Sequence, residues 1–385
     1  MKIKSVNYFK NFKGKRVLLR VDFNVPLENN KVRDDYKIVA GLETIKLLLS
    51  QKAKIIIITH LSDSNLSVAP VVARLRKILN KKIKFISETI NAKVEAAVKK
   101  MGDGEIIFLE NLRFNKGELE DDQIFAKQLA GLADLYVNDA FAVSHRAQAS
   151  VSAVKDYLPS FAGLLLEKEL KALNKVIKPK KPFVVIMGGA KINTKAPLIS
   201  KLYPVANQIL LGGGLANNFF KFNKLEIGRS LYDADSMLTI KKLLRGKMKD
   251  TKIILPVDVV VRSTKGKISL KKTSEVKKND AILDIGPETT TLYATYIKKA
   301  QTIIWNGPMG KFEEEHFKNG TLSIARLIAT RSTGKAYGLV GGGETVEALK
   351  MSGMMQYVDW VSTAGGAMLS YLGGEKMPGL KKIVS

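Results

Sequence analysis

Three polar side chains occupy alternate positions near the start of the chain. Residues 15–26 read Lys-Arg-Val-Leu-Leu-Arg-Val-Asp-Phe-Asn-Val-Pro, so a short apolar run ends in Arg20, Asp22 and Asn24. Successive side chains of a strand point to opposite faces, and these three groups are therefore expected on the same side of a sheet. A cation, an anion and an amide in line can bind a small polar ligand. The alternative is a sheet face that carries one ion pair.

Three further candidate ligand groups follow apolar runs in the first half of the chain. His60 comes directly after one run, and Arg113 and Arg146 follow two later runs. The planar guanidinium fork suits carboxylate and phosphate because it donates two hydrogen bonds at once. Each residue alone is more typical of a structural salt bridge or a buried histidine. Together they predict a basic site for a small molecule that carries a carboxylate and a phosphate.

Glycine turns follow several apolar runs in the second half of the chain. They lie at residues 188–191, 212–214, 286–287, 307–310, 341–343 and 364–366. Glycine lets the backbone approach a ligand closely, and free N–H groups at a helix start attract phosphate. None of the turns is a Walker loop or a G-x-G-x-x-G fingerprint, which disfavours a P-loop ATPase and a nicotinamide dehydrogenase.

Charged side chains accompany two of these glycine turns. Lys191 and Lys195 are four residues apart, so on a helix start both point to one face and suit a polyphosphate. In a lysine-rich chain the alternative is ordinary surface charge. Glu344 and Thr345 directly follow the turn at 341–343. A carboxylate at this position can bind Mg²⁺ together with phosphate oxygens. The alternative is an acidic residue at a helix N-terminus, where the helix dipole favours negative charge.

The elements that must position these groups alternate between strands and helices. In the first half the apolar runs lie at 17–21, 54–59, 83–86, 106–109 and 135–137, and helical stretches at 37–50, 69–79, 92–101 and 121–132. In the second half the runs lie at 183–187, 208–211, 252–255, 281–284, 302–305, 336–340 and 360–362. This rhythm predicts α/β architecture, with two doubly wound parallel-sheet (Rossmann-like) domains. Ligands of such sheets bind beyond the carboxyl ends of the strands.

A domain boundary is expected near residues 162–182. The stretch 162–178 reads as an amphipathic helix, which Pro179 and Pro182 end before the next strand. We expect this helix to act as a hinge element. The length of 385 residues and the hydrophobic content of 45% also suit two domains.

Composition excludes several classes of site. The chain has no cysteine, hence no disulfide or thiolate metal site, and its three histidines are too scattered for a zinc site.

No apolar run approaches 18 residues, and the first residues lack the apolar block of a signal peptide, so we expect a cytoplasmic protein. The net charge of +27 attracts anions, but the lysines are spread along the chain, which disfavours a dedicated nucleic-acid site.

The chain resembles the phosphoglycerate kinase family over essentially its whole length. The matching segments are residues 15–26, 110–114, 136–150, 188–191, 212–216, 255–261, 284–287, 305–310 with 312–313, 341–343 and 362–367. The resemblance implies reversible phosphoryl transfer between 1,3-bisphosphoglycerate and Mg-ADP, which yields 3-phosphoglycerate and ATP. It also implies a hinge-bending monomer. An N-terminal glycerate domain (1–165) would be completed by the tail 368–385, and 166–367 would form the nucleotide domain.

The resemblance also assigns site residues at matching positions. The glycerate ligands would be Asp22, Asn24, His60, Arg113 and Arg146. Lys191 would stabilise the transferring phosphoryl group, Glu313 would bind the ribose and Glu344 would engage Mg²⁺. The nucleotide would be held by Lys195, Gly212, Gly213, Gly214, Asn306, Gly342, Gly343 and Thr345.

The sequence departs from the family pattern at both sites. Lys37 stands where the family usually has an arginine that contacts the transferring phosphoryl group, so the charge stays and the bidentate fork is lost. The loop after His60 is shortened, lacks a substrate-binding arginine and places Asp63 where its charge would repel an anion. Thr194 and Glu344 replace two aspartates, and Gln148 and Ala364 replace a histidine and a glycine.

We therefore expect a working phosphoglycerate kinase with a modified glycerate site, in which Lys37 and Asp63 belong to that site. The alternative is a degenerate relative that binds nucleotide or another anion with little or no turnover.

Overall fold

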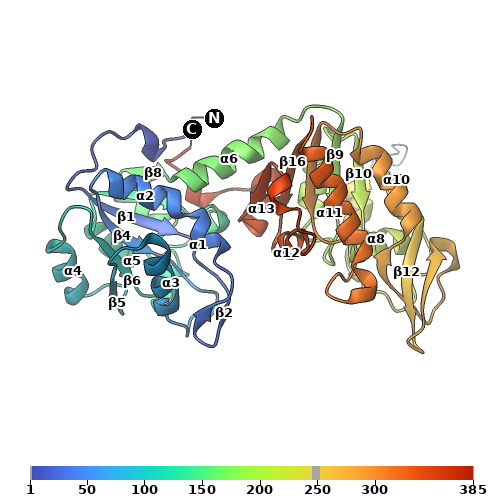
Figure 1. Ribbon diagram of the computed structural model, residues 1–385, viewed down its shortest axis with the longest axis horizontal. Coiled ribbons are helices and arrows are strands. Elements are labelled where there is room, and N and C mark those ends of the chain that lie inside the picture. The colour runs from blue at the N-terminus through green and yellow to red at the C-terminus, as the bar shows by residue number, and fades with distance from the viewer. Residues whose placement is uncertain (1, 245–251, 385) are drawn as a thin grey trace. The chain divides into compact units, whose positions relative to one another are not determined.

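The computed structural model describes residues 2–244 and 252–384 (Figure 1). The chain divides into two compact units: unit 1 comprises Met1–Lys171 and Lys376–Ser385, and unit 2 comprises Ala172–Glu375. Unit 2 is therefore an insertion within the sequence of unit 1.

The division differs from the sequence boundaries at residues 166–171 and 368–375. Helix α6 (Leu164–Ile177) begins in unit 1, where its Glu167 accepts a hydrogen bond from the hydroxyl of Ser5. Helix α13 (Gly365–Gly373) belongs wholly to unit 2, where it packs on α7 (Ala196–Leu202). Both helices continue past the expected boundaries. The boundaries between the units therefore lie later in the sequence than expected, after residue 171 and after residue 375.

Unit 1 is built around a parallel six-stranded sheet in the order β5-β6-β4-β1-β7-β8. The strands are β1 (Arg16–Val21), β4 (Lys54–Ile58), β5 (Lys84–Ile86), β6 (Ile106–Leu109), β7 (Leu135–Asp139) and β8 (Ser160–Ala162). The side chains of β1 alternate between the two faces of the sheet. Val17 and Leu19 therefore share one face, where they pack in a hydrophobic cluster with Ile45. The sequence did not predict β8, which is too short to show a period.

The helices of unit 1 surround this sheet (Figure 1). They are α1 (Tyr36–Ala40), α2 (Leu42–Ser50), α3 (Ala69–Leu79), α4 (Ala92–Lys99) and α5 (Gln123–Gly131), followed by α6. The single helix expected over 37–50 is wrong, because Gly41 divides it into α1 and α2. A Cβ at Gly41 would lie 2.9 Å from the ring of Phe23, so the chain requires glycine at this close approach.

Unit 2 contains a second parallel six-stranded sheet, in the order β11-β10-β9-β15-β16-β17. Its strands are β9 (Phe183–Met187), β10 (Gln208–Leu211), β11 (Ile253–Ile254), β15 (Thr302–Asn306), β16 (Tyr337–Gly341) and β17 (Trp360–Ser362). The core of unit 2 includes Val184, Ile303 and Trp305, all of them fully buried. The parallel α/β prediction is confirmed for both large sheets.

One run that we expected in a parallel sheet belongs to a separate antiparallel sheet. Residues 281–284 lie in β14 (Asp280–Ile285), which pairs with β12 (Asp258–Ser263), and β12 pairs with β13 (Ile268–Lys272). The sequence did not predict strand β12, because only three apolar residues of its sequence, Asp-Val-Val-Val-Arg-Ser, are consecutive and polar residues flank them.

The helices of unit 2 connect its parallel strands. They are α7, α8 (Gly213–Phe222), α9 (Ser236–Leu244), α10 (Pro287–Ile297), α11 (Asn319–Ser332), α12 (Gly343–Met351) and α13. Three of them begin directly after a parallel strand with a glycine at or next to the first position: α8, α12 and α13. The first N–H groups of such helices have no partner within the helix. In α8, however, Gly213 and Leu215 donate theirs to the carbonyl oxygens of Met309 and Gly189.

The C-terminal residues return to unit 1 and bind to β7 and to the 3-10 helix Ala153–Asp156. The ammonium group of Lys155 donates to the carbonyl oxygens of Pro378 and Lys381, the latter at 3.0 Å. The side chain of Asn138 donates to the carbonyl of Gly379 at 3.0 Å. Since Lys155 is only 3% exposed, these carbonyls replace the water that its charge requires.

Candidate functional site

The candidate anion site of unit 1 lies at the carboxyl ends of its four central strands. Asp22 and Asn24 follow β1, His60 follows β4, Arg113 follows β6 and Arg146 follows β7. These strands are neighbours in the order β6-β4-β1-β7, so one sheet edge carries all five residues.

Arg20 is buried beneath this edge and is held by a network inside the protein. Its Nε donates to the Ser150 hydroxyl at 2.8 Å, and its Nη2 lies 3.7 Å from Glu118 Oε1. Its Nη2 also lies 3.2 Å from Nδ1 of His60. A guanidinium group only donates, so this His60 nitrogen accepts and the neutral ring carries its proton on Nε2.

The imidazole of His60 is kept neutral by this environment. Burial and the nearby Arg20 hold the pKa of His60 well below its usual value, although Asp22 acts in the opposite direction. A neutral His60 with a proton on Nε2 can donate one hydrogen bond to an anionic ligand. The sequence did not predict Glu118, which lies in no recognisable spacing with Arg20.

Asp22 forms an ion pair with Lys37, with Nζ and Oδ2 2.6 Å apart. Burial by itself raises the pKa of Asp22, but Lys37 and the other basic neighbours together outweigh it, and the pKa lies below its usual value. Asn24 bonds instead to the loop after His60, because its Nδ2 donates to Ser62 Oγ and its Oδ1 accepts from Ser62 N, both at 2.8 Å. Asp22 and Asn24 are thus held by different elements, α1 and the loop after β4.

The shortened loop at residues 60–67 uses Asp63 to stabilise its own turn. The Asp63 carboxylate accepts a hydrogen bond from the backbone N–H of Asn65 at 2.8 Å. The backbone carbonyl of Asp63 accepts a hydrogen bond from Asn111 Nδ2 at 3.2 Å. Its side chain is exposed to solvent. Asp63 is therefore a turn residue that adds negative charge to the rim of the site.

Arg113 and Arg146 supply positive charge that carboxylates of the described chain do not pair. Arg113 Nη1 donates to the carbonyl of Ser62 at 2.8 Å, while its buried Nε has no partner among the described residues. Burial and the proximity of Arg146 lower the pKa of Arg113. Arg146 is exposed, and its Nε approaches the ring of His145 at 3.4 Å. Two neighbouring guanidinium groups of this kind favour a bound anion.

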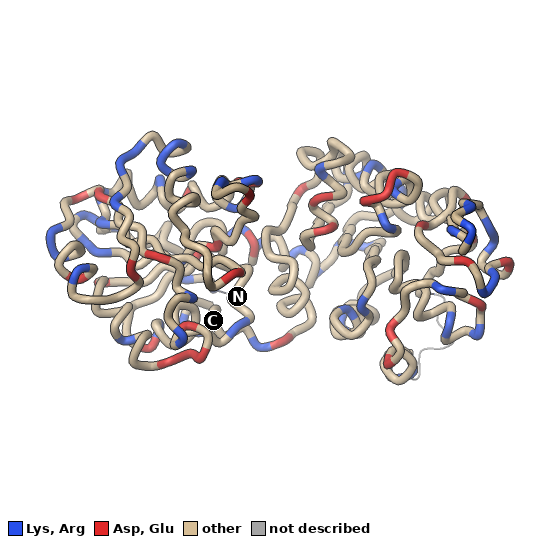
Figure 2. Tube along the Cα trace, turned by 90° about the horizontal axis from the view of Figure 1, so that it is seen from below, with Lys and Arg blue, Asp and Glu red and all other residues tan. Residues whose placement is uncertain are grey.

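The positively charged residues of the chain are not confined to this site. Lysine and arginine are distributed along the trace of both units (Figure 2). Such a distribution steers anions toward the protein without selecting one surface.

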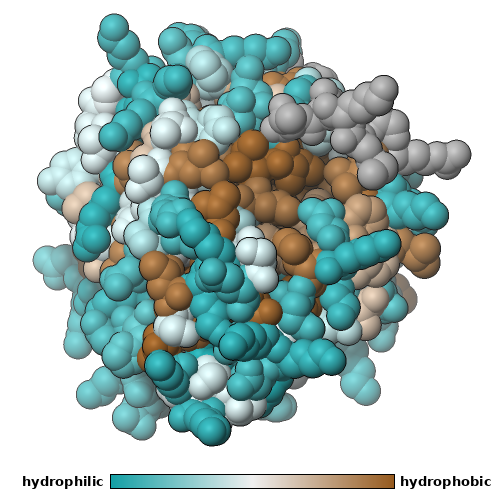
Figure 3. All heavy atoms as spheres, turned by 90° about the vertical axis from the view of Figure 1, so that its right-hand side faces the viewer, coloured by the Kyte–Doolittle hydropathy of each residue, from teal (hydrophilic) through white to brown (hydrophobic). Residues whose placement is uncertain are grey.

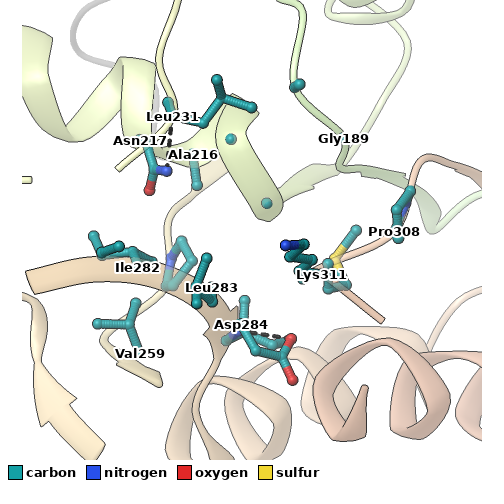
Figure 4. Close-up of a pocket in the computed structure, with 18 of the residues that line it drawn as sticks. Gly189, Ala216, Asn217, Leu231, Val259, Ile282, Leu283, Asp284, Pro308 and Lys311 are labelled. Atoms are coloured by element: carbon teal, nitrogen blue, oxygen red, sulfur yellow. Dashed lines mark hydrogen bonds between the residues drawn. The ribbon is translucent and has the colours of Figure 1, made fainter. Parts of the chain in front are cut away.

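Unit 2 contains a cavity of about 420 Å³ beside the carboxyl ends of β9 and β10 (Figure 4). Of the predicted nucleotide-site residues, Gly213, Gly214, Glu313 and Glu344 line it. Apolar side chains line much of the rest, among them Leu231, Val259, Ile282, Leu283 and Met309. Hydrophobic side chains also gather in a patch on one face of this unit (Figure 3).

A buried network holds the turns around this cavity. The ammonium group of Lys195 donates to Asn306 Oδ1 at 2.7 Å, and Asn306 Nδ2 donates to the carbonyl of Gly341 at 2.7 Å. The hydroxyl of Thr345 accepts from the N–H of Gly307 at 2.7 Å. These bonds connect the turns after β9, β15 and β16.

The ammonium group of Lys195 is buried in this network. Burial lowers the pKa of Lys195 to about 8, although Glu344 acts in the opposite direction. No carboxylate of the described residues lies within ion-pair distance of its ammonium group. Among the described residues its hydrogen-bond acceptors are only the side-chain and backbone oxygens of Asn306. The ammonium group can therefore still form an ion pair with a phosphate bound nearby.

The remaining predicted residues have distinct positions. Lys191 is exposed on the loop before α7. Gly212 precedes α8, and Gly342 precedes α12 with a φ of +106°, which favours glycine. Gly343 is the first residue of α12, so its N–H is one of the free donors at that helix start.

The cavity is also lined by four polar or charged residues that the sequence did not assign to the site: Asn217, Arg229, Asp284 and Lys311. Burial raises the pKa of Asp284 to about 7, although its carboxylate accepts from the N–H groups of Gly320 and Ile285. Asn217 is 1% exposed and lies one turn into α8. Asp284 belongs to the matched segment 284–287, which was the available signal, whereas no signal distinguished Asn217.

Mg²⁺ fits the carboxylates on this cavity only together with phosphate ligands. Glu344 and Glu313 line the cavity, and Glu344 lies in the first turn of α12. No group of three or more His, Cys, Asp or Glu side chains able to hold a metal is found within residues 2–244 and 252–384. One or two carboxylates plus phosphate oxygens and water is the usual environment of Mg²⁺ beside a nucleotide.

The helices within those ranges include none that is long and apolar enough to span a membrane.

Comparison with known proteins relates both units to one family. The family model described as phosphoglycerate kinase matches residues 6–375. A phosphoglycerate kinase of Wolbachia sp. subsp. Brugia malayi is 43% identical over 384 residues, which cover 97% of this chain and 96% of the relative. One of Pelotomaculum thermopropionicum is 40% identical and covers 97% of both chains.

Solved structures give the same result for the fold. The structure of phosphoglycerate kinase from Coxiella burnetii has a TM-score of 0.87 and 38% identity over 99% of both chains. The crystal structure of phosphoglycerate kinase from Pyrococcus horikoshii OT3 also has a TM-score of 0.87, with 29% identity over 98% of both chains.

Proposed function

This chain belongs to the phosphoglycerate kinase family, and we propose that it binds the glycerate on unit 1 and the nucleotide on unit 2. The reaction is the reversible transfer of a phosphoryl group between 1,3-bisphosphoglycerate and ADP, which gives 3-phosphoglycerate and ATP. Unit 1 with its C-terminal residues is the glycerate domain in this proposal, and unit 2 is the nucleotide domain.

One observation carries the assignment of the glycerate to unit 1. Arg146 is close enough to Arg113 to lower its pKa, and carboxylates of the described residues form an ion pair with neither. A substrate with a carboxylate and a phosphate would neutralise both guanidinium groups by bidentate bonds. Asn24, Asp22 and neutral His60 would orient the hydroxyl and carboxylate groups between them.

Lys37 would supply the positive charge nearest to the transferring group. Phosphoryl transfer needs alignment and cations around the equatorial oxygens rather than covalent chemistry from the protein. Lys37 is one quarter exposed and its ammonium group already binds Asp22, so it can donate toward a phosphate without leaving the site. Asp63, tied into its own turn, would weaken substrate binding modestly through its charge.

On unit 2 the nucleotide would occupy the cavity. Lys195 and the N–H groups at the start of α12 would bind phosphate, and exposed Lys191 would stabilise the transferring phosphoryl group. Glu313 would bind the ribose. Gly212, Gly213, Gly214, Gly342 and Gly343 would allow close approach of the phosphates, with Asn306 and Thr345 fixing the turns. Mg²⁺, held by Glu344 and the phosphates, would neutralise phosphate charge.

The proposal also includes hinge-bending at α6, a monomer, and a cytoplasmic location without a nucleic-acid partner. Water must be excluded during transfer, since it would otherwise hydrolyse the acyl phosphate, and a hinge permits such closure. The helix α6 contains the division between the two units, which supports it as the hinge element.

A coupled assay of purified protein tests the proposal. ATP formation from ADP and 1,3-bisphosphoglycerate is expected, and Lys191→Ala should abolish most of it. Lys201→Ala, which alters an exposed lysine of α7, is the matched control and should leave turnover unchanged. Turnover no greater than a buffer blank, together with calorimetric binding of Mg-ADP, would instead indicate a degenerate relative that binds without catalysis.

A further inference from the structure

We propose that Asn217 makes this nucleotide site select a base that presents a hydrogen-bond donor, as the 6-amino group of adenine does, over a base with a carbonyl oxygen at that position. The proposal rests on the assignment of the unit 2 cavity to the nucleotide, and it adds a specificity-determining residue to it.

The orientation of the Asn217 amide is fixed by its neighbour. Its Nδ2 donates to the carbonyl oxygen of Leu231 at 3.0 Å. A carbonyl oxygen can only accept, so the NH₂ group must face Leu231 and Oδ1 must face away from it (Figure 4). Oδ1 is buried and has no hydrogen-bond partner among the described residues. The site therefore contains an acceptor of defined direction that the protein itself leaves unsatisfied.

The position of Asn217 in the cavity identifies the part of the ligand that it meets. Figure 4 places Asn217 with Leu231, Ile282 and Val259, whereas Pro308 and Lys311 lie toward the opposite end. A flat, largely apolar base suits the aliphatic end, and phosphates suit the end with the glycine turns and the lysine. The free acceptor thus lies at the end of the cavity that suits the base.

The unsatisfied oxygen gives the site a physical basis for selection. A buried acceptor without a donor costs free energy, which a donor on the ligand recovers. A carbonyl oxygen in the same place would leave two acceptors facing each other with no proton between them. A site built around such a polar group discriminates against an analogue that lacks the matching group more strongly than an apolar pocket does.

The next residue along the helix provides a contrast. Asn218 is also fully buried, but its Nδ2 donates to the carbonyl of Gly214 and its Oδ1 accepts from the N–H of Asp233, both at 2.8 Å. Its amide is thus satisfied inside the protein and does not line the cavity. Asn218 can therefore serve as a matched control for loss of a buried amide from α8.

The test compares kcat/KM for ATP and ITP, with 3-phosphoglycerate as acceptor. The base of ITP has a carbonyl oxygen at position 6 in place of the amino group, and a proton on N1. The wild type should prefer ATP by about tenfold, the scale of one neutral hydrogen bond. Asn217→Ala should lower kcat/KM for ATP, leave or raise it for ITP, and reduce the ratio at least about fivefold. Asn218→Ala should keep the wild-type ratio even if it lowers stability.

An unchanged ratio in Asn217→Ala, or no preference in the wild type, would overturn the proposal. If Asn217→Ala does not fold, Asn217→Leu preserves the volume and makes the same comparison. If the wild type turns over neither nucleotide, the proposed function fails, and calorimetric dissociation constants for ADP and IDP then decide the role of Asn217 separately. Equal affinities for these two diphosphates would count against it.

Discussion

Replacing Arg20 by methionine is expected to destabilise unit 1 strongly, because it leaves a carboxylate buried without its cation. The side chains of Arg20 and Glu118 are 0% and 1% exposed, and their nearest charged atoms are 3.7 Å apart. At an effective dielectric constant of 20, two unit charges at that distance attract by about 4.5 kcal/mol. Removal of one partner from a buried pair costs about 3–5 kcal/mol. We therefore expect Arg20→Met to lose about 4 kcal/mol of stability near pH 7.

The pH dependence of that loss has a defined sign. Burial already raises the pKa of Glu118 in the folded chain, although Arg20 acts in the opposite direction. Without Arg20 the pKa rises further, so the folded state binds a proton more readily than the unfolded state does. Acid consequently favours the folded variant. The destabilisation should be largest near neutral pH and should shrink as the pH falls toward the pKa of Glu118 in the unfolded chain.

Hydrogen–deuterium exchange of peptides from β1 and β7 measures the loss within unit 1. Tryptophan fluorescence is unsuitable, because both tryptophans, Trp305 and Trp360, belong to unit 2. The matched control is the double variant Arg20→Met with Glu118→Gln, whose neutral amide needs no cation and which should recover most of the stability. Equal losses in the single and double variants, or a loss that does not change with pH, would refute the unpaired charge as the cause.

Three other outcomes are expected. Lys37→Arg should raise kcat by up to about tenfold, because a guanidinium can bind Asp22 and still donate toward the phosphoryl group; an unchanged or lower kcat in the coupled assay would show that lysine is the better residue here. Affinity for ADP, measured by calorimetry, should fall as the pH rises from 7 to 9, since Lys195, with a pKa of about 8, loses its charge there. Lys195→Met should bind ADP weakly without that trend, and a persistent trend would assign it to another group. Gly307→Ala should lower the thermal stability of unit 2 by about 1–3 kcal/mol, because its φ is +93° and a Cβ would overlap the carbonyl oxygen of Gly188; a melting temperature equal to wild type would contradict this.

The parallel sheets could be predicted because their strands are buried on both faces. Stretches such as 183–187 are apolar throughout, and the helices between them are long enough to show a period. The antiparallel strands 258–263 and 268–272 expose part of their surface and carry polar residues, so their pattern resembles a loop. The break at Gly41 depends on the ring of Phe23, a contact that no local pattern reveals.

The candidate site could be predicted as far as its residues follow strand ends. That rule located His60 and Arg113, together with the glycine turns of unit 2. It could not show that Arg20 is committed to Glu118, since these residues meet only through the fold. It also overstated Asp63, whose carboxylate is used by its own turn.

The C-terminal residues have a consequence for the synthesis of the chain. Lys155 is buried against carbonyl groups of Pro378 and Lys381, which the ribosome adds more than two hundred residues later. Until then its ammonium group lacks those partners, and unit 1 cannot reach its final stability. Unit 2 is contiguous in sequence and has all of its residues earlier. The nascent chain should therefore complete its second unit before its first, so a chain truncated by about ten residues would carry a finished unit 2 and an unfinished unit 1.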